Sequence, residues 1–329
     1  MPSLTYQDLH AAHAGAIEAE VTAALEAAGP PGGLLRTACE ELLDRQPMRY
    51  PLSVLPLAVH GAETGDPEPA LPLAAVHLLW WTAACRMDDV ADGESAAGEG
   101  ASGPETSLST LALGTLLPLR LLGSPRLPGP SQQSLAAELI SCGLAAVGGQ
   151  LADLRGASGI APRRGAVLAA YRGKSGAPFA MITGMAALLA GASPERTAAW
   201  REFGDLLGIL WQFFNDQEDI ASGRNEDLAN GTATHLLACA AESASLAEAA
   251  RLGLLRQAAR TSPRAREELL GMLLRDEALE LFRQDVERHR VLAHQVLGRL
   301  GGREPYASCL RDLVDQAARP SLPAPVPAR

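Results

Sequence analysis

The most informative stretch of the sequence is Cys85-Arg86-Met87-Asp88-Asp89-Val90-Ala91-Asp92-Gly93-Glu94, and the rest of the chain is interpreted from it. It follows an apolar run, Leu71–Ala84, which is long enough for a buried helix. On that helix Asp88 and Asp92 share a face and Asp89 lies at its edge. Carboxylates are disfavoured in a last helical turn because the backbone dipole is negative there, so this end favours a cation. Oxygen ligands of this kind suit Mg²⁺, although acidic triplets also occur on solvated surfaces.

A second acidic stretch, Asn215-Asp216-Gln217-Glu218-Asp219, repeats the design. We expect it near the end of a helix that is capped by Ser193 or Pro194 and runs from 195 to 222, before a glycine and a polar loop. Asn215 and Asp219 are again four residues apart, with Asp216 beside them. Two such helix ends facing each other would hold a cluster of Mg²⁺ ions, which could bind a diphosphate and activate it as a leaving group.

The composition favours helices and excludes some partners. Hydrophobic residues make up 47% of the 329 residues and aromatic residues only 4%, with few β-branched side chains. The net charge of −10 argues against nucleic acid or an anionic membrane as the main partner. The five cysteines have no paired spacing, and neither a signal peptide nor a membrane-spanning segment is evident, so we expect a cytoplasmic protein.

Helical periodicity and breaks at glycine and proline predict an all-α chain. The expected architecture is a single large helical bundle over residues 1–318, with site residues pointing inward around a central active-site cavity, and a Pro-rich disordered tail over residues 319–329. Gly93–Gly103 reads as a flexible lid or linker, and Gly173–Gly176 as an interruption between two helices. The expected helices cover residues 6–28, 34–43, 51–59, 71–92, 108–122, 131–153, 166–172, 177–190, 195–222, 232–260, 264–274, 276–300 and 306–318.

Taken together and in order, these motifs resemble the trans-isoprenyl diphosphate synthase family of the class I terpenoid-synthase fold. The stretches 88–92 and 215–219 resemble its two aspartate-rich motifs, with Asn215 in place of the leading aspartate. Lys174-Ser175 resembles its Lys-Thr or Lys-Ser pair, and the stretch 149–154 its Gly-Gln-x-x-Asp-Leu helix. Lys174 is the only lysine in the chain. Because a compact ammonium charge differs from a planar guanidinium, we expect that Lys174 has a chemical role that an arginine would not fill.

The resemblance implies a Mg²⁺-dependent enzyme that ionises an allylic prenyl diphosphate and transfers the cation to isopentenyl diphosphate or another acceptor. It assigns the residues as follows: Asp88, Asp89, Asp92, Asn215, Asp216 and Asp219 as ligands of a three-ion cluster; Lys174, Arg36 and Arg224 as diphosphate contacts; Gln150 and Asp153, with Asp88, Asp92 and Lys174, as catalytic residues. It also implies a homodimer. Ala83 and Ala84 are small where shorter-chain relatives are bulky, so they would leave room for a C15 to C20 chain above Trp80 or Trp81. Ordinary core packing is the alternative explanation for both tryptophans, and it is slightly favoured.

The chain also departs from the family pattern. Gly32-Gly33-Leu34-Leu35-Arg36 has no lysine, and no basic residue occurs between Gly93 and Leu119, where chain-elongating members carry arginines. A class I terpene cyclase therefore remains an alternative, although aromatic residues, which stabilise cations, are scarce. A non-catalytic regulatory subunit is a third alternative. The seven histidines form no evident metal-binding pattern, and His77 on its apolar helix is expected to be a core residue.

Overall fold

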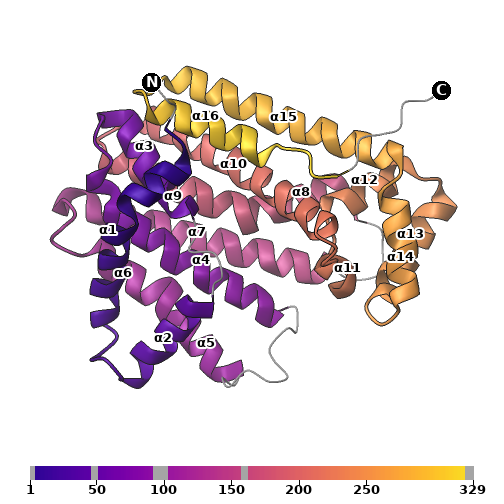
Figure 1. The fold of residues 1–329 in the computed structure, drawn as a ribbon, viewed down its shortest axis with the longest axis horizontal. Helices are drawn as coiled ribbons and strands as arrows, with labels where there is room; N and C mark the ends of the chain where they lie inside the picture. Colours follow the sequence, from indigo (N-terminus) through magenta and orange to yellow (C-terminus); the bar gives the residue numbers. More distant parts are fainter. Residues whose placement is uncertain (1–3, 46–50, 92–102, 157–161, 323–329) are drawn as a thin grey trace. The chain divides into compact units, whose positions relative to one another are not determined.

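The structure is a computed structural model that describes residues 4–45, 51–91, 103–156 and 162–322 (Figure 1). Within these ranges all of the assigned secondary-structure elements are helical, which confirms the all-α prediction. The helices are α1 Tyr6–Glu26, α2 Leu34–Arg45, α3 Leu55–Thr64, α4 Leu71–Ala91, α5 Gly103–Leu111, α6 Leu117–Leu122, α7 Gly129–Gly156, α8 Arg164–Tyr171, α9 Ala177–Leu189, α10 Pro194–Ala221, α11 Glu226–Asn230, α12 His235–Ser243, α13 Leu246–Ala259, α14 Pro263–Leu273, α15 Asp276–Leu300 and α16 Tyr306–Ala317, with short 3₁₀ turns η1 Pro51–Val54 and η2 Glu68–Ala70 and π-helical turns η3 Ala112–Leu116 and η4 Arg172–Gly176.

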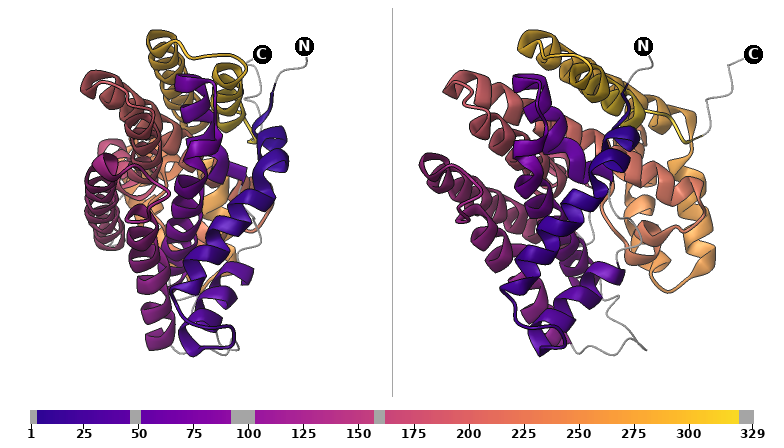
Figure 2. Two further views of the ribbon diagram at one scale, coloured as in Figure 1. Left: turned by 90° about the vertical axis from the view of Figure 1, so that its left-hand side faces the viewer. Right: turned by 60° about the vertical axis from the view of Figure 1, so that its left-hand side comes forward.

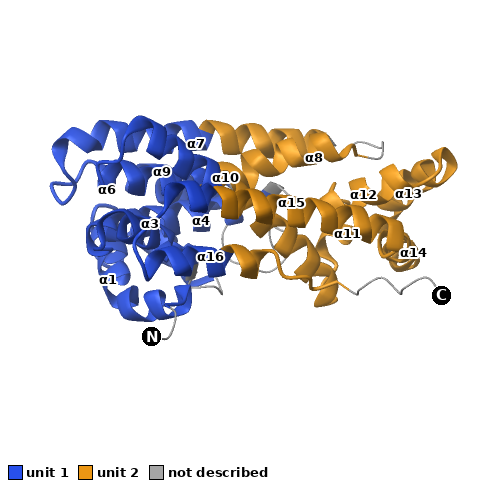
Figure 3. Ribbon diagram, turned by 90° about the horizontal axis from the view of Figure 1, so that it is seen from above, with its two compact units in different colours: residues 1–143, 180–204, 296–313 blue, residues 144–179, 205–295, 314–329 orange. Residues whose placement is uncertain are grey.

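The helices form two compact units, coloured separately in Figure 3. Unit 1 comprises residues 1–143, 180–204 and 296–313, and unit 2 comprises residues 144–179, 205–295 and 314–329. Helices α7, α9, α10, α15 and α16 each continue from one unit into the other. No loop linker therefore separates the units at these points, and the single-domain assignment stays a prediction.

Unit 1 is organised around α4. Helices α1, α5 and α6 and the π-helical turn η3 pack against it (Figures 1 and 2). Leu73, Val76 and Leu79 of α4 are fully buried, which removes one side of the helix from water. A fully buried aliphatic side chain contributes about 1.5–3 kcal/mol, so this face holds α4, and the acidic residues at its end, in place.

Unit 2 has an aromatic core centred on Phe213 of α10. Its ring centroid lies 5.5 Å from that of Phe282, 4.9 Å from that of His235 and 5.4 Å from that of His289. Phe213 and Phe282 are almost fully buried. At the edge of the unit, α13 and α14 pack side by side as a helical hairpin (Figures 1 and 2). The Phe213 cluster fixes the last three turns of α10, where the second acidic stretch lies.

The structure corrects three sequence predictions. Gly173–Gly176 does not interrupt the helix, because the π-helical turn η4 joins α8 to α9 without a break. The helix expected over residues 232–260 is two helices, since Ser245 begins α13 with a capping box that involves Glu248. The loop expected over Arg224–Gly231 contains the short helix α11.

Other predictions fall partly or wholly outside the described residues. Asp92 and nearly all of the expected lid, Gly93–Gly103, lie there, as do residues 323–329 of the expected disordered tail. The first residues of the expected tail, up to Leu322, are described. Leu322 is buried, and the backbone N–H of Ser321 donates to Gln217 Oε1 at 3.2 Å.

Helix α7 is unusually exposed for its composition. By length and composition alone, the segment Gly129–Arg155 could cross a membrane. Only 22% of an apolar 18-residue stretch within it is buried. Core helices of soluble proteins pass the same test, but they are mostly buried. The large apolar side chains of α7 that are exposed are Ile140, Leu144, Val147, Leu151 and Leu154.

Candidate functional site

Asp216, in the second acidic stretch, is buried and hydrogen-bonded on both carboxylate oxygens. The Tyr171 hydroxyl donates to Oδ2 at 2.5 Å, and Gln212 Nε2 donates to Oδ1 at 3.0 Å. Burial raises the pKa of Asp216 from 3.8 to about 6, against the lowering effect of the two donors. Burial and the nearby Asp216 charge raise the pKa of Tyr171 well above its usual value, so this phenol stays protonated and acts as the donor.

Asp219, three residues on, holds the start of the short helix α11. Its Oδ1 accepts the backbone N–H of Glu226 at 3.0 Å, and its Oδ2 accepts the N–H of Asp227 at 3.2 Å. These are N–H groups of a first helical turn, which have no partner within the helix. Burial, with the neighbouring charges of Asp216 and Asp219, raises the pKa of Asp227 well above its usual value. A third carboxyl group, that of Asp227, therefore lies near Asp216 and Asp219, although it follows the second acidic stretch in the chain.

The π-helical turn η4 places Lys174 in the same unit. Its ammonium donates to Asp153 Oδ2 at 2.8 Å, and both side chains are largely buried. Next to it, the Ser175 hydroxyl donates to Gln212 Oε1 at 2.7 Å. Helix α7 crosses this turn closely, since a side chain carbon at Gly149 would lie only 2.8 Å from the Gly173 Cα. Lys174 is thus paired with Asp153, and its neighbour Ser175 is connected through Gln212 to Asp216 of α10.

The remaining predicted residues of unit 2 are less buried than Asp216 and Asp219. Asn215 is half-buried, on the same side of α10 as Gln212. Gln150 on α7 is also half-buried. Arg224 is more exposed, pairs with Glu226 at 3.2 Å and lies 4.0 Å from Asp219 Oδ1. Arg224 thus has an acidic partner already, as Lys174 has.

The first acidic stretch belongs to unit 1. Asp88 and Asp89 are half-buried in the last described turn of α4. Arg86 Nη1 lies 3.3 Å from Asp89 Oδ2. Arg36, the predicted diphosphate contact in this unit, pairs with Glu40 on α2 at 2.8 Å.

The predicted chain-pocket residues all lie on α4. Ala83 is buried, and a side chain carbon at Gly114 of η3 would lie 2.6 Å from its Cβ, so close helix packing also explains its small size. Trp80 is buried, whereas Ala84 and Trp81 are half-buried. The Trp81 ring meets the edge of His77 with 6.1 Å between centroids. Burial lowers the pKa of His77 to about 4, which confirms that it is a neutral core residue.

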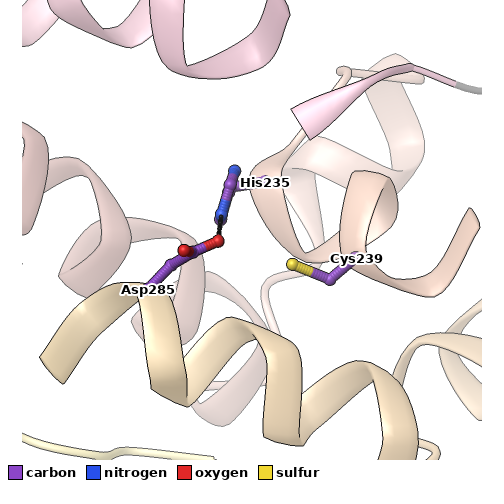
Figure 4. A group of neighbouring side chains, drawn as sticks. All are labelled: His235, Cys239 and Asp285. Carbon is purple, nitrogen blue, oxygen red and sulfur yellow. Dashed lines mark hydrogen bonds and ion pairs between the residues drawn. The ribbon is translucent and has the colours of Figure 1, made fainter. Parts of the chain in front are cut away.

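A further polar group in unit 2, drawn in Figure 4, resembles a metal site in its residue types. His235, Cys239 and Asp285 offer ligand atoms that all lie within 4.8 Å of one another. However, Arg164 Nη1 donates to the same Asp285 oxygen that His235 Nε2 contacts, at 3.0 Å and 2.9 Å. Burial raises the pKa of the Cys239 thiol to about 12, so it is not a thiolate at neutral pH. Because the guanidinium already supplies the positive charge, we interpret this group as a buried ion-pair network.

Sequence reasoning missed three members of the site, namely Tyr171, Gln212 and Asp227. Gln212 and Asp216 are four residues apart on one helix face, and so are Tyr171 and Ser175 across the π-helical turn. Both spacings can be seen in the sequence, but neither shows which helices contact each other in the fold. Asp227 was missed because its segment reads as a polar loop.

Comparisons with known proteins agree on the fold. No family model and no curated protein sequence matches the chain. Among solved structures, a geranylgeranyl pyrophosphate synthase is similar with a TM-score of 0.82 at 15% identity, over 96% of this chain and 98% of that one. A Caulobacter crescentus CB15 polyprenyl synthase complexed with calcium and isoprenyl diphosphate gives 0.80 at 19% identity, over 96% and 97%. A Corynebacterium glutamicum geranylgeranyl pyrophosphate synthase complexed with isoprenyl diphosphate and magnesium gives 0.74 at 19% identity, over 92% and 97%. The chain therefore has the fold of these prenyl diphosphate synthases.

Proposed function

We propose that this chain is a divergent member of the trans-isoprenyl diphosphate synthase family, and that it ionises an allylic prenyl diphosphate with the help of Mg²⁺. The predicted motifs occur in the family's order, and the fold is that of prenyl diphosphate synthases over nearly the whole chain. A fold alone does not specify a reaction, so the proposal depends on the residues of the site.

The Lys174 network is the observation that carries the proposal. The only lysine of the chain lies in a π-helical turn, bonded to Asp153 at 2.8 Å, and its neighbour Ser175 is hydrogen-bonded to the helix that ends in the second acidic stretch. Single π-helical turns within α-helices often mark functional sites. An ammonium point charge beside carboxylates suits the binding of a metal-complexed diphosphate.

The side chains fit a hard divalent cation. Asp88 and Asp89 of α4 and Asn215 of α10 are half-buried oxygen donors, which suit Mg²⁺ better than softer metals. Asp216 and Asp219 each accept hydrogen bonds, but a carboxylate oxygen keeps a further lone pair for a ligand. Bound Mg²⁺ would neutralise the diphosphate as it leaves. Lys174, with Arg36 or Arg224, would then hold the departing group, and Gln150 and Asp153 would lie along the chain cavity.

Transfer to an acceptor, isopentenyl diphosphate or another nucleophile, is our preferred reaction, with a C15 to C20 allylic substrate. The alternative, a terpene cyclase, gains support from one feature of α10. Trp211 and Phe214 are half-buried, one turn before and directly beside Asn215, with ring centroids 5.4 Å apart. Aromatic faces stabilise carbocations, which a cyclase must guide through several steps.

The test is an incubation of the purified chain with Mg²⁺ and geranyl, farnesyl or geranylgeranyl diphosphate, each with and without isopentenyl diphosphate. Products are analysed by mass spectrometry before and after phosphatase treatment. A longer prenyl alcohol that requires both isopentenyl diphosphate and phosphatase supports elongation. A hydrocarbon or cyclic alcohol without isopentenyl diphosphate supports the cyclase. No consumption of any allylic diphosphate, with or without EDTA, would contradict ionisation by this chain alone and favour a non-catalytic subunit.

We also propose that the chain forms a homodimer through α7. The side chains of Ile140, Leu144, Val147, Leu151 and Leu154 are 44% to 73% exposed and follow the 4-3-4-3 spacing of a helix–helix seam. Beside the seam, Ala137, Ser141, Ala145, Gly148 and Ala152 are exposed and small, which allows close approach of a second helix. No exposed residue of α7 from 137 to 154 is charged, unlike a solvated helix face. A second copy offers the same seam, so the two faces are complementary.

Leu144→Asp tests this assignment because it places a charge in the middle of the seam. We expect the wild-type chain to sediment as a dimer and Leu144→Asp as a monomer of unchanged helicity. The control is Val291→Asp, which changes an exposed apolar residue of α15 and should leave the dimer intact. A monomeric wild type contradicts the proposal, and so does wild-type flotation with lipid vesicles that Leu144→Asp abolishes, because the seam would then bind a membrane.

A further inference from the structure

Tyr171, the last residue of α8, connects three helices of unit 2 through one hydroxyl group. The hydroxyl is buried, donates to Asp216 Oδ2 of α10 at 2.5 Å and accepts the backbone N–H of His235, the first residue of α12, at 2.9 Å. That N–H belongs to a first helical turn and has no partner within its own helix. The hydroxyl therefore satisfies two buried groups that would otherwise lose hydrogen bonds.

The hydrogen bond from Tyr171 to Asp216 belongs to a larger group of four residues, Tyr171, Ser175, Gln212 and Asp216, which we call the clamp. Tyr171 and Ser175 lie four residues apart across the π-helical turn η4, and Gln212 and Asp216 lie four residues apart on α10. Ser175 Oγ donates to Gln212 Oε1 at 2.7 Å, and Gln212 Nε2 donates to Asp216 Oδ1 at 3.0 Å. Tyr171, at the end of α8, and Ser175 of η4 are thus joined to Gln212 and Asp216 of α10 by a continuous chain of hydrogen bonds.

Each side of the clamp carries a residue that the proposed reaction needs. Lys174 lies between Tyr171 and Ser175 in the chain, and Asn215 lies between Gln212 and Asp216. Gly208 permits this close crossing, since a side chain there would collide with the Ser175 carbonyl oxygen. Because the four clamp residues surround Lys174 and Asn215 in sequence, any slippage between η4 and α10 changes the spacing of those two side chains.

We propose that Tyr171 is a positioning residue that fixes the spacing between Lys174 and the oxygen donors at the end of α10, so that one divalent-metal diphosphate complex can engage both. This inference rests on the proposed function. It predicts that loss of the hydroxyl weakens binding of the metal and diphosphate more than it slows the subsequent reaction, because the reacting groups themselves remain.

Tyr171→Phe isolates the hydroxyl, because the ring keeps its contacts with Phe213 and His235 at centroid distances of 6.2 Å and 6.5 Å. The matched control is Tyr306→Phe, which removes a hydroxyl from a half-buried tyrosine of unit 1. Calorimetric titration of Mg²⁺ into each protein with inorganic pyrophosphate measures the site without turnover. We expect Tyr171→Phe to raise the half-saturating Mg²⁺ concentration about tenfold, a typical effect of changing a residue that orients a ligand, and Tyr306→Phe to leave it unchanged.

Kinetics and a mutant cycle separate positioning from packing. We expect Tyr171→Phe to raise KM for the allylic diphosphate by about tenfold and to lower kcat by less, because ground-state binding is what the clamp supports. Ser175→Ala, which removes the hydrogen bond to Gln212, should shift Mg²⁺ binding in the same direction. In an Asp216→Ala background Tyr171→Phe should add no further shift, since the acceptor is gone. Additive effects would overturn the proposal, because the hydroxyl would then act independently of Asp216.

The outcomes for the wild-type chain distinguish this inference from the proposed function. If the wild type binds Mg²⁺ and pyrophosphate and Tyr171→Phe binds them equally well, the positioning role is overturned while the proposed function stands. If the wild type shows no Mg²⁺-dependent binding of pyrophosphate, the proposed function fails and the positioning role falls with it. Asp216→Ala is needed only for the cycle, so an unfolded Asp216→Ala still leaves the Tyr171→Phe and Ser175→Ala titrations decisive.

Discussion

The two acidic stretches are similar in sequence but differ in their surroundings. Asp88 and Asp89 of α4 are half-buried, and Asp89 has an arginine 3.3 Å away. Asp216 and Asp219 of α10 are buried, and each uses both carboxylate oxygens to accept hydrogen bonds from the protein. The second stretch is thus buried within the internal hydrogen bonding of its unit, whereas the first is only half-buried.

This difference separates two consequences of substitution. Removing an acid of the first stretch should affect activity more than stability, because these carboxylates are only half-buried. Removing an acid of the second stretch should affect both, because a buried donor left without a partner costs about 1–3 kcal/mol. The first two predictions below compare activity with the free energy of unfolding, and the last two examine the second stretch alone.

The largest effect on activity is expected from Asp88→Ala. Loss of a metal ligand should lower turnover of the allylic diphosphate by at least about 10³-fold, because metal-assisted charge stabilisation contributes several kcal/mol. The free energy of unfolding should change less than in a variant that removes the buried Asp216 or Asp219, because Asp88 is only half-buried. Urea unfolding followed by circular dichroism measures it. Asp44→Ala, at an exposed acid of α2, is the control and should change neither quantity.

Lys174→Ala should lower kcat/KM by about 10²-fold, since it removes the positive charge beside the diphosphate. It should also destabilise the chain by about 1 kcal/mol, because Asp153 loses its ion-pair partner at 2.8 Å. Lys174→Arg restores the charge but not the compact shape, so we expect only partial recovery of activity. Full activity in Lys174→Ala would remove the main support for the site in unit 2.

The helices were largely predictable because their ends carry local signals. Helix α15 has its expected bounds, Asp276–Leu300, and Ser193 Oγ accepts the Arg196 N–H at the start of α10, as expected of a cap. The acidic stretches were found for the same reason, because their spacing lies within single helical turns. The π-helical turn was missed because two glycines in Gly173–Gly176 indicate a break, whereas close contact with Gly149 of α7 requires a residue without a side chain.

The contacts that define the second stretch could not be predicted. Tyr171 and Asp216 are far apart in the chain, and so are Ser175 and Gln212, and no periodicity reports which helices cross. The sequence assigned Asp216 and Asp219 to metal binding from their spacing on a helix and from the family resemblance. Their hydrogen bonds to Tyr171 and to the start of α11 depend on tertiary packing, which local spacing does not encode.

Asp216 should give the second stretch a distinct pH dependence. Burial raises its pKa from 3.8 to about 6, so between these values the folded chain binds the proton more tightly than the unfolded chain. The free energy of unfolding contributed by this group is therefore present at low pH and is lost as the pH rises through this window. Relative to Asp216→Asn, the wild type should lose on the order of 2 kcal/mol between pH 4 and pH 6, measured by urea unfolding with EDTA. Parallel curves for the two proteins would contradict this environment for Asp216.

The smallest expected effect distinguishes a structural role of Asp219 from a metal-binding role. Asp219→Ala removes the acceptor for the N–H groups of Glu226 and Asp227, which should destabilise the chain by about 1–2 kcal/mol, as for loss of a helix cap. Hydrogen exchange at these two amides should accelerate, whereas exchange in α15 should not. Asp219→Asn keeps one oxygen acceptor and should lose less stability than Asp219→Ala. If its half-saturating Mg²⁺ concentration is unchanged, Asp219 serves the fold of α11; a large rise without loss of stability would assign it to the metal.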